Sequence, residues 1–401
     1  MAADRALRGG RRAHGRRRPN ALGAEEALIT TPDRTPELTI AHLTPTSFSS
    51  SSVLGGGERY VANVARAVAR AATADHVPVD QRIVSLGGER SSVIVEGIRL
   101  ETLPNDTQRP GPMNAISHHL REALVGADVV HVHQSLTVFG AYATATAASM
   151  GIPVVLTDLG GGADENMLAG RGMDLAAAVV SISAYAGALI GSSIMGRHEV
   201  ILGPVDTETF HPQQADGLRG EGILCVGRIL PHKGVDRIVR ALPPQLSLTI
   251  IGQPYDQPYL DLVKGLARGK DVTFVHDADD EMVRRHYSTS ALLVQASTTL
   301  DAYGRRVEKP ELLGFTPLEA MACGAPVLLA KTASLPELIA GTDAGRLFRD
   351  DEELAQALRE WAQGTWRPGL SSADVREHVV RTFGLEVAGR RLLEVYQGVL
   401  D

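Results

Sequence analysis

The chain has 401 residues, enough for two domains with full hydrophobic cores, and its 44% hydrophobic and 22% charged residues are ordinary for a globular protein. A formal net charge of −7 argues against a nucleic-acid binder, which usually carries a basic domain. No run of eighteen apolar residues is present to predict a transmembrane segment, and two cysteines cannot build a disulfide framework, so a reducing cytoplasm fits.

The first 36 residues differ from the rest of the chain. Seven arginines and one acidic residue fall within the first eighteen positions, without the apolar stretch of a secretory signal. Because the segment also lacks hydrophobic periodicity, we expect residues 1–36 to be a disordered extension. Attachment to an anionic surface is one use for such a segment, and an extension without a role in catalysis is the simpler interpretation.

Strands alternating with helices are predicted along the rest of the chain. A first strand, ELTIAHLTP (37–45), is followed by a serine-rich loop and by a helix with Val61, Val64, Ala65 and Val68 on one face. Three more strands follow, with helical stretches such as AISHHLREALV between them: QRIVSLG, DVVHVH and PVVLTD. A second series of strands comes after a connection bearing Pro, Gly and Asp: GILCVG, LSLTIIG, DVTFVH, ALLVQAS and PVLLA. This alternation predicts an α/β protein with two doubly wound parallel sheets.

Two cations lie between a predicted strand and a predicted helix in ILCVGRILPHKGVDRIVRAL (223–242). The helix has apolar residues at i, i+3, i+4 and i+7, and the loop before it carries Arg228 and Lys233 between two glycines, Gly227 and Gly234. The chain has five lysines against thirty-five arginines, so a lysine just before a helix is less expected as background charge. Two surface cations are the alternative, but the strand–loop–helix context favours a phosphate site.

Two carboxylates, Glu311 and Glu319, stand eight positions apart in ELLGFTPLEAMACGAPVL. Thr316 followed by Pro317 predicts a helix start between them, and such a helix directs its free N–H groups toward the preceding loop as a seat for a diphosphate. Glu319 also has the spacing of a capping box with Thr316. The alternative is therefore that Glu319 only caps the helix and that Glu311 is a solvated loop residue.

GRILPHKGVDRIVRAL and E-x7-E followed by AMACGAPV resemble the retaining glycosyltransferases of family 4, which have the GT-B fold. The similarity extends along most of the chain from about residue 38. Other family segments occur in the usual order: GGGERYVANVARAVA, DVVHVHQ, SAYAGALI, ILGPVDTETFHP and LTIIGQPYDQPYL. No single short motif carries this assignment; the ordered set does.

The resemblance implies two Rossmann-like domains that face each other across a cleft. We expect an acceptor-binding domain over 37–202, a linker over 203–220, a nucleotide-sugar-binding domain over 221–380 and, over 381–401, a helix that crosses back to the first domain. In open α/β sheets ligands bind beyond the carboxyl ends of the strands, so the site is expected between the domains.

The family pattern assigns Arg228 and Lys233 to the donor diphosphate, where fixed cations stabilise the charge that develops as the nucleoside diphosphate leaves. It places Glu311 close to the transferred sugar and Glu319 on both ribose hydroxyls. Further donor-binding residues are implied in the loops around these four: Gly227, Gly314, Phe315 and Thr316.

On the acceptor side, Gly56 and Gly57 belong to a glycine run that is no dinucleotide fingerprint, because Tyr60 stands where the third glycine would be. Close backbone approach to the acceptor and the leaving phosphate is the expected use, and a merely flexible loop is the alternative. His133 is expected at the cleft end of a strand, whereas His131 is expected to be buried on the sheet.

One departure from the family pattern concerns the donor sugar. Relatives commonly carry a histidine two residues after the threonine that ends the fourth strand, where it reaches the sugar's 6-hydroxyl. Counting from Thr157, that position is Leu159, which cannot donate to a hydroxyl. Either Asp158 or another side chain substitutes, or the donor sugar is altered at C6; an alignment wrong by one is the remaining alternative.

A D-x-D pattern in DADD (277–280) is the metal site of the other large glycosyltransferase fold. Here it precedes the predicted helix EMVRRHY, so Asp279 or Asp280 as an N-cap is the simpler account, and we expect no metal ion and no cofactor. Cys225 and Cys323 are expected in the core.

These patterns predict a cytoplasmic, metal-independent, retaining glycosyltransferase that uses a UDP- or GDP-sugar. No basic amphipathic helix with aromatic residues marks the first domain, which favours a soluble small-molecule acceptor, and the arginine excess favours natural-product biosynthesis. Front-face substitution suits a site without an obvious nucleophile, with Glu311 as a covalent nucleophile the alternative. A same-fold phosphorylase or epimerase, or a non-catalytic sugar-nucleotide-binding protein, stays open. No nucleic-acid partner is expected, and a homodimer is compatible with the sequence.

Overall fold

The computed structural model describes residues 38–46, 56–107, 111–160, 172–191, 196–213, 219–220 and 222–401. The extension expected over 1–36 lies outside the described residues, as does most of the serine-rich loop before the first helix.

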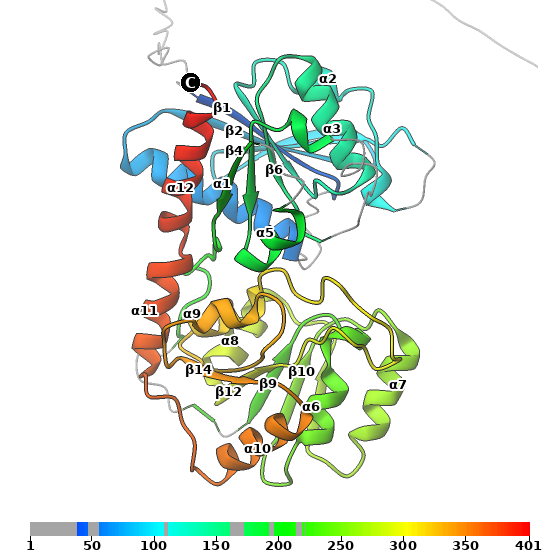
Figure 1. Cartoon of the computed structure of the whole chain (residues 1–401), viewed down its shortest axis with the longest axis vertical. Coiled ribbons are helices and arrows are strands. Elements are labelled where there is room, and N and C mark those ends of the chain that lie inside the picture. The colour runs from blue at the N-terminus through cyan, green and yellow to red at the C-terminus, as the bar shows by residue number, and fades with distance from the viewer. Residues whose placement is uncertain are drawn as a thin grey trace, which may run out of the picture. The chain divides into compact units, whose positions relative to one another are not determined.

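An eight-stranded sheet forms the first half of the described chain, in the order β3-β4-β2-β1-β5-β6-β7-β8 (Figure 1). Its pairings are parallel except for the β3–β4 hairpin. The strands are β1 (Leu38–Thr44), β2 (Val79–Gly87), β3 (Ser91–Val95), β4 (Ile98–Pro104), β5 (Val129–His133), β6 (Val154–Thr157), β7 (Ala178–Ser181) and β8 (Arg197–Val200). The described α-helices of this half are α1 (Gly56–Ala74), α2 (Leu120–Ala123), α3 (Val138–Ser149) and α5 (Ala184–Ile190).

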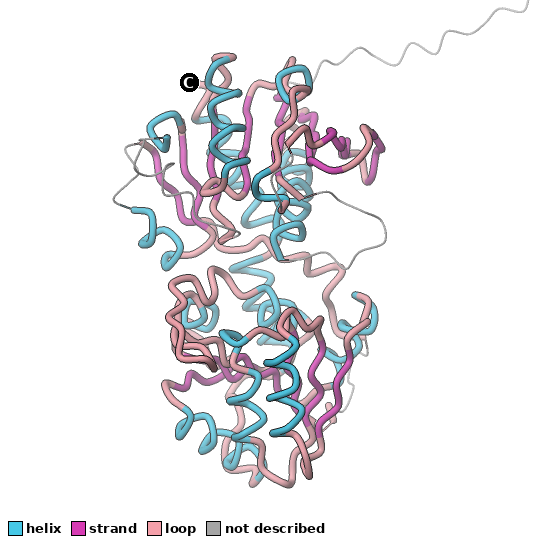
Figure 2. Tube along the Cα trace, turned by 90° about the vertical axis from the view of Figure 1, so that its right-hand side faces the viewer, coloured by secondary structure: helices cyan, strands magenta, loops and turns pink. Residues whose placement is uncertain are grey.

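A six-stranded parallel sheet forms the second half, in the order β11-β10-β9-β12-β13-β14. Helices flank the strands of both sheets (Figure 2), which confirms two doubly wound α/β domains. The strands are β9 (Ile223–Val226), β10 (Leu248–Ile251), β11 (Val272–Val275), β12 (Leu292–Gln295), β13 (Val327–Ala330) and β14 (Gly345–Phe348). The helices are α6 (Val235–Ala241), α7 (Gln257–Leu266), α8 (Asp280–Thr289), α9 (Phe315–Ala322), α10 (Asp351–Ala362), α11 (Ser372–Phe383) and α12 (Leu385–Gly398).

The helix predicted in AISHHLREALV is wrong over most of its length, because only the four residues of α2 are α-helical there. Side chains that follow β4 bind two amides of the segment before α2. Asn105 Oδ1 accepts from Ile116 N at 3.2 Å, and Asp106 Oδ2 accepts from His118 N at 2.7 Å. These bonds hold the segment in a non-helical conformation up to α2.

The last helix, α12, lies against α1, the first helix of the chain (Figure 1). The contact is close at Gly389, where an added Cβ would lie 2.1 Å from Ala67 O. Farther along α12, the Tyr396 hydroxyl hydrogen-bonds His131 Nδ1 on β5 at 2.6 Å. The end of the chain is therefore fixed to the first sheet by backbone packing and by a buried hydrogen bond.

Gly389→Ala should lower the free energy of unfolding by about 1–3 kcal/mol, because the added methyl group forces α12 away from α1. Gly265→Ala in α7 is the matched control, since a Cβ there meets nothing within 4 Å. This control should be neutral or stabilising by up to about 1 kcal/mol. Urea denaturation of the three proteins measures both effects, and a G389A variant as stable as wild type would contradict the packing of α12.

Candidate functional site

Loops at the carboxyl ends of the neighbouring strands β9 and β12 bring Lys233 and Glu311 together. Lys233 Nζ donates to Glu311 Oε2 at 2.8 Å and to Pro310 O at 3.2 Å. Gln295, the last residue of β12, donates from Nε2 to the same carboxylate oxygen. The Lys233 and Glu311 side chains are 17% and 15% exposed, so the pair is held in place and yet accessible.

A second cation, Arg228, follows β9 in the same loop. It is exposed, its guanidinium lies 6.0 Å from the centre of the Tyr255 ring, and no carboxylate in the described part of the chain pairs with it. Burial, together with the nearby Lys233 and Arg228 charges, lowers the pKa of His232 from 6.5 to about 4, so this imidazole is neutral near pH 7. Two cations and one carboxylate in these loops leave a net positive charge, which suits an anionic ligand.

Helix α9 begins earlier than the sequence predicted, and the capping box between Thr316 and Glu319 is wrong. Gly314 is the N-cap, with a left-handed backbone (φ 96°), and no side chain caps the helix. That conformation turns the chain into the helix at Phe315, so Thr316 is already a helical residue. Glu319 lies in the second turn and is free for another role.

The Glu319 carboxylate is 5% exposed. Its Oε2 accepts from the Tyr287 hydroxyl at 3.1 Å, and Arg59 Nε lies 3.2 Å from Oε1. The Arg59 contact is an ion pair without hydrogen-bond alignment, so Oε1 has no hydrogen-bond donor among the described residues. Burial raises the pKa of Glu319, and the Arg59 charge opposes that rise. A buried acceptor without a hydrogen-bond donor is rare and is compatible with a donor from a ligand.

The two glycines that begin α1 allow close approach by side chains of both halves. A Cβ on Gly56 would lie 3.9 Å from Phe315 Cδ2. A Cβ on Gly57 would lie 3.1 Å from Gln134 Nε2 and 3.9 Å from Leu159 Cδ1. The structure therefore places Gly57 beside Leu159 and Gly56 beside Phe315, the first residue of α9.

Asp158 and Lys309 form an ion pair that the sequence analysis missed. Lys309 Nζ donates to Asp158 Oδ2 at 2.8 Å, and Asp158 Oδ1 accepts from Gly160 N at 3.2 Å. Lys309 is one of five lysines in the chain. The rarity of lysine, which drew attention to Lys233, was a usable signal for Lys309 as well.

His133 ends β5 and His131 is buried, as expected, but His133 is as fully buried as His131, so the expected difference in burial is wrong. Their ring centres lie 4.0 Å apart, and His133 Nε2 lies 3.3 Å from His42 Nδ1. Burial lowers the pKa of all three imidazoles, that of His42 to about 4. His131 uses both ring nitrogens, bonding Tyr396 and Thr157. The cluster joins strands of the first sheet to α12.

Neutral imidazoles bind metal ions, and one nitrogen from each of His42, His131 and His133 lies within 4.8 Å of the others. Nevertheless, most of their ring nitrogens are already hydrogen-bonded, and the cluster of described residues contains no carboxylate to neutralise a buried dication. A hydrogen-bonded structural network is the better account of these histidines.

Asp279 caps α8, since its side chain accepts from Met282 N at 2.8 Å, which confirms the N-cap interpretation of DADD. Asp280, the first residue of α8, bonds Arg59 instead. Cys225 and Cys323 are buried and free, as expected for core residues.

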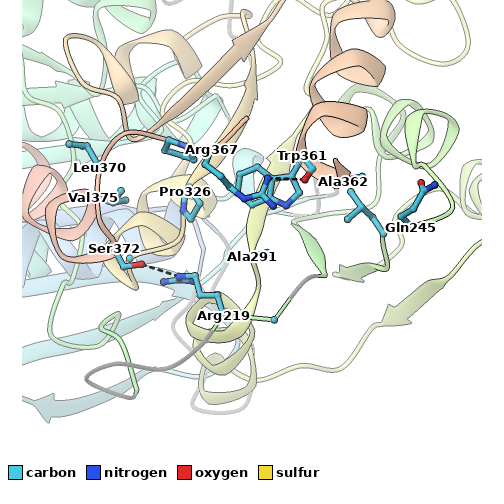
Figure 3. Close-up of a pocket in the computed structure, with 14 residues that line it drawn as sticks. Arg219, Gln245, Ala291, Pro326, Trp361, Ala362, Arg367, Leu370, Ser372 and Val375 are labelled. Atoms are coloured by element: carbon cyan, nitrogen blue, oxygen red, sulfur yellow. Dashed lines mark hydrogen bonds between the residues drawn. The ribbon is translucent and has the colours of Figure 1, made fainter. Parts of the chain in front are cut away.

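A pocket of about 510 Å³ lies at the opposite end of the strands of the second sheet from Lys233 and Glu311 (Figure 3). Ala291 and Pro326 line it just before β12 and β13, so it opens at the amino ends of the strands, whereas Lys233 and Glu311 lie at the carboxyl ends. Arg219, a half-buried cation in its lining, already donates to Tyr287 O, Ser290 O and Cys323 O. The pocket is separate from the candidate site.

Comparison with known proteins identifies the family. Residues 54–209 match Glycosyltransferase Family 4, and residues 206–368 match Glycosyl transferases group 1. The chain belongs to the family 4-like glycosyltransferases. In the part of the chain that the structure describes, no helix has the length and apolar character needed to cross a bilayer.

Among curated proteins, the chain is 29% identical over 198 residues to a GDP-mannose-dependent alpha-(1-6)-phosphatidylinositol monomannoside mannosyltransferase of Mycolicibacterium smegmatis. This match covers 41% of the chain and 51% of that protein, so the chain spans about half of the relative's length.

Among solved structures, sucrose-phosphate synthase from Thermosynechococcus elongatus has a TM-score of 0.68 at 20% identity, covering 90% of this chain and 99% of that one. AviGT4, a glycosyltransferase involved in avilamycin A biosynthesis, has a TM-score of 0.62 at 18% identity, covering 90% and 98%. At these identities the likeness shows the GT-B fold alone.

Acidification should destabilise the protein through the buried histidines. His42 has a lower pKa folded (about 4) than unfolded (6.5), so the unfolded chain binds the proton first and stability is lost as pH falls below 6.5. Between pH 7 and 5 this one group should cost about 2 kcal/mol. Urea denaturation at both pH values should show a smaller loss for His42→Gln than for wild type, whereas exposed His118→Gln should behave as wild type. Equal losses in H42Q and wild type would contradict burial of a neutral His42.

Proposed function

We propose that this chain is a retaining, metal-independent glycosyltransferase that moves a sugar from a UDP- or GDP-sugar to a small-molecule acceptor. The contact between Lys233 and Glu311, in the same loops as Arg228, which pairs with no carboxylate among the described residues, carries this proposal. It sets two cations and one carboxylate at the carboxyl ends of parallel strands, where open α/β sheets bind ligands.

Lys233 and Arg228 suit the diphosphate of the donor. Cleavage of the bond to the sugar leaves negative charge on the departing phosphate oxygen, and cations already fixed in place stabilise that charge as it forms. Gly227 and the backbone N–H groups of Gly314, Phe315 and Thr316 are further proposed contacts to the donor.

Glu311 is better suited to stabilising positive charge on the sugar than to covalent attack. Lys233 and Gln295 both donate to its Oε2, and such bonds reduce the nucleophilicity of a carboxylate. We therefore favour front-face substitution, in which the leaving phosphate takes the acceptor's proton. The atoms balance: the acceptor oxygen gains the sugar, and the nucleoside diphosphate leaves with the proton.

Glu319 is proposed to bind the donor ribose. Its Oε1 is a buried acceptor without a hydrogen-bond donor among the described residues, and a ribose hydroxyl is a donor of the right kind.

The acceptor is proposed to be a soluble small molecule of a natural-product pathway, for which the avilamycin glycosyltransferase offers a structural parallel. A glycolipid acceptor is the second candidate, favoured by the phosphatidylinositol mannoside named for the mycobacterial relative. Assays with water-soluble glycosides and with lipid acceptors in vesicles distinguish the two.

Lys233→Ala and Arg228→Ala should each lower turnover by about a hundredfold or more, because each removes charge from the leaving group. Arg240→Ala is the matched control, since this exposed arginine lies on α6 and pairs only loosely with Asp236, at 3.8 Å. Donor hydrolysis and transfer rates give the measurement. Near-wild-type kcat in both variants would contradict the diphosphate assignment.

EDTA should leave the transfer rate unchanged, because cationic side chains take the place of a metal ion at the diphosphate. Measuring the rate before and after chelation, and again after manganese is added, checks this. Loss of activity that manganese restores would return the D-x-D aspartates to consideration as ligands.

Leu159→His should improve the use of plain hexose donors, if Leu159 faces C6 of the donor sugar. A buried hydroxyl without a partner costs about 1–3 kcal/mol, or roughly five- to hundredfold in kcat/KM. Leu159→Met, which adds no hydrogen-bonding group, is the control. The measurement compares kcat/KM for a hexose donor and its 6-deoxy analogue in each protein. A wild type that prefers the plain hexose tenfold would contradict the C6 proposal.

A further inference from the structure

Arg59, in the first turns of α1, contacts two carboxylates on helices of the second half. It donates to both oxygens of Asp280, at 3.1 and 2.7 Å, and its Nε lies 3.2 Å from Glu319 Oε1. Its guanidinium also lies 5.3 Å from the centre of the Phe210 ring. With a side chain only 14% exposed, Arg59 is among the most enclosed charges of the interface between α1, α8 and α9.

The two contacts of Arg59 differ in quality. The Asp280 contact is a two-pronged pair with hydrogen-bond geometry, the strong form of an arginine–carboxylate interaction. The Glu319 contact lacks that alignment and leaves Oε1 without a hydrogen-bond donor. Arg59 can therefore give up Glu319 when another donor replaces it there, and it can keep Asp280, whose side chain is 42% exposed and can follow it.

Arg59 also blocks access to Glu319. The carboxylate is 5% exposed, its Oε2 is taken by the fully buried Tyr287, and Arg59 lies against Oε1. Because Glu319 is so enclosed, a hydroxyl donor that approaches Oε1 competes for space with the Arg59 guanidinium.

We propose that Arg59 is a latch residue, which the ribose of the donor displaces from Glu319, so that donor binding loosens the contact of α1 with α9. This inference rests on the proposed binding of a nucleoside diphosphate sugar. The exchange replaces an unaligned ion pair by an aligned hydroxyl-to-carboxylate hydrogen bond. It leaves Arg59 neutralised by Asp280, and it leaves the Glu319 carboxylate with hydrogen bonds from Tyr287 and from the ribose in place of the Arg59 charge.

The latch predicts that removing the Arg59 guanidinium strengthens nucleotide binding. The apparent dissociation constant should fall by about tenfold. This is the change expected when roughly nine molecules in ten hold the Arg59–Glu319 contact before the nucleotide binds, and the variant removes that contact. Isothermal titration of UDP and of GDP into wild type, Arg59→Met and Arg59→Gln measures this. Arg66→Met is the matched control, because Arg66 lies on the same helix and pairs with Glu96 instead. Circular dichroism establishes that each variant is folded.

A second measurement distinguishes a latch from a structural role. Glu319→Gln removes both the ribose acceptor and the latch partner, so it should weaken nucleotide binding more in the Arg59→Met background than in wild type. Equal effects in the two backgrounds would overturn the latch. Weaker binding in Arg59→Met would also overturn it, since Arg59 would then be a ligand of the nucleotide.

The same titrations separate this inference from the proposed function. If neither UDP nor GDP binds wild type or the Arg59 variants, the nucleotide-sugar assignment fails. If one of them binds wild type and Arg59→Met with the same affinity, the nucleotide assignment stands and the latch alone is wrong.

Discussion

The ion pair between Lys233 and Glu311 is the constraint around which the candidate site is built. It joins the loop after β9 to the loop after β12, two strands that are neighbours in the second sheet although they are far apart in sequence. The pair fixes a carboxylate that Gln295 also holds. Because Lys233 is then partly neutralised, the charge available to an incoming anion depends on Arg228, which no described carboxylate neutralises.

Ion pairs also join the two halves of the described chain. Asp158 of the first half holds Lys309 of the second, and Arg59 of the first holds Asp280 of the second. Each pair is partly or largely removed from water. Breaking such a pair therefore leaves a poorly solvated charge. A ligand that enters between these groups has to supply replacement partners. A diphosphate and a ribose do so, since one brings negative charge and the other brings hydroxyl donors.

The sequence predicted well whatever depends on local pattern. The i, i+3, i+4, i+7 series in 235–242 gave α6, with Val235, Ile238, Val239 and Leu242 buried, because periodicity alone decides which face of a helix turns inward. Prediction from the sequence failed where a tertiary hydrogen bond or a single glycine decides the conformation of the backbone. Tertiary hydrogen bonds from Asn105 and Asp106 hold the segment before α2, and the left-handed Gly314 moved the start of α9. Strand β3, exposed on both faces, offered no alternation to detect.

The site followed the same division. Arg228, Lys233, Glu311 and Glu319 could be chosen from spacing and family resemblance, but their partners could not, because Arg59 and Gln295 reach them only through tertiary packing. The pair of Lys309 with Asp158 depends on tertiary packing in the same way. Glu319 shows what that packing adds. From sequence it was either a capping-box residue or a ribose ligand, and both fit the spacing. The early start of α9 removes the first alternative. It leaves a buried carboxylate with one oxygen that accepts no hydrogen bond from the described residues, which is the observation that the ribose proposal uses.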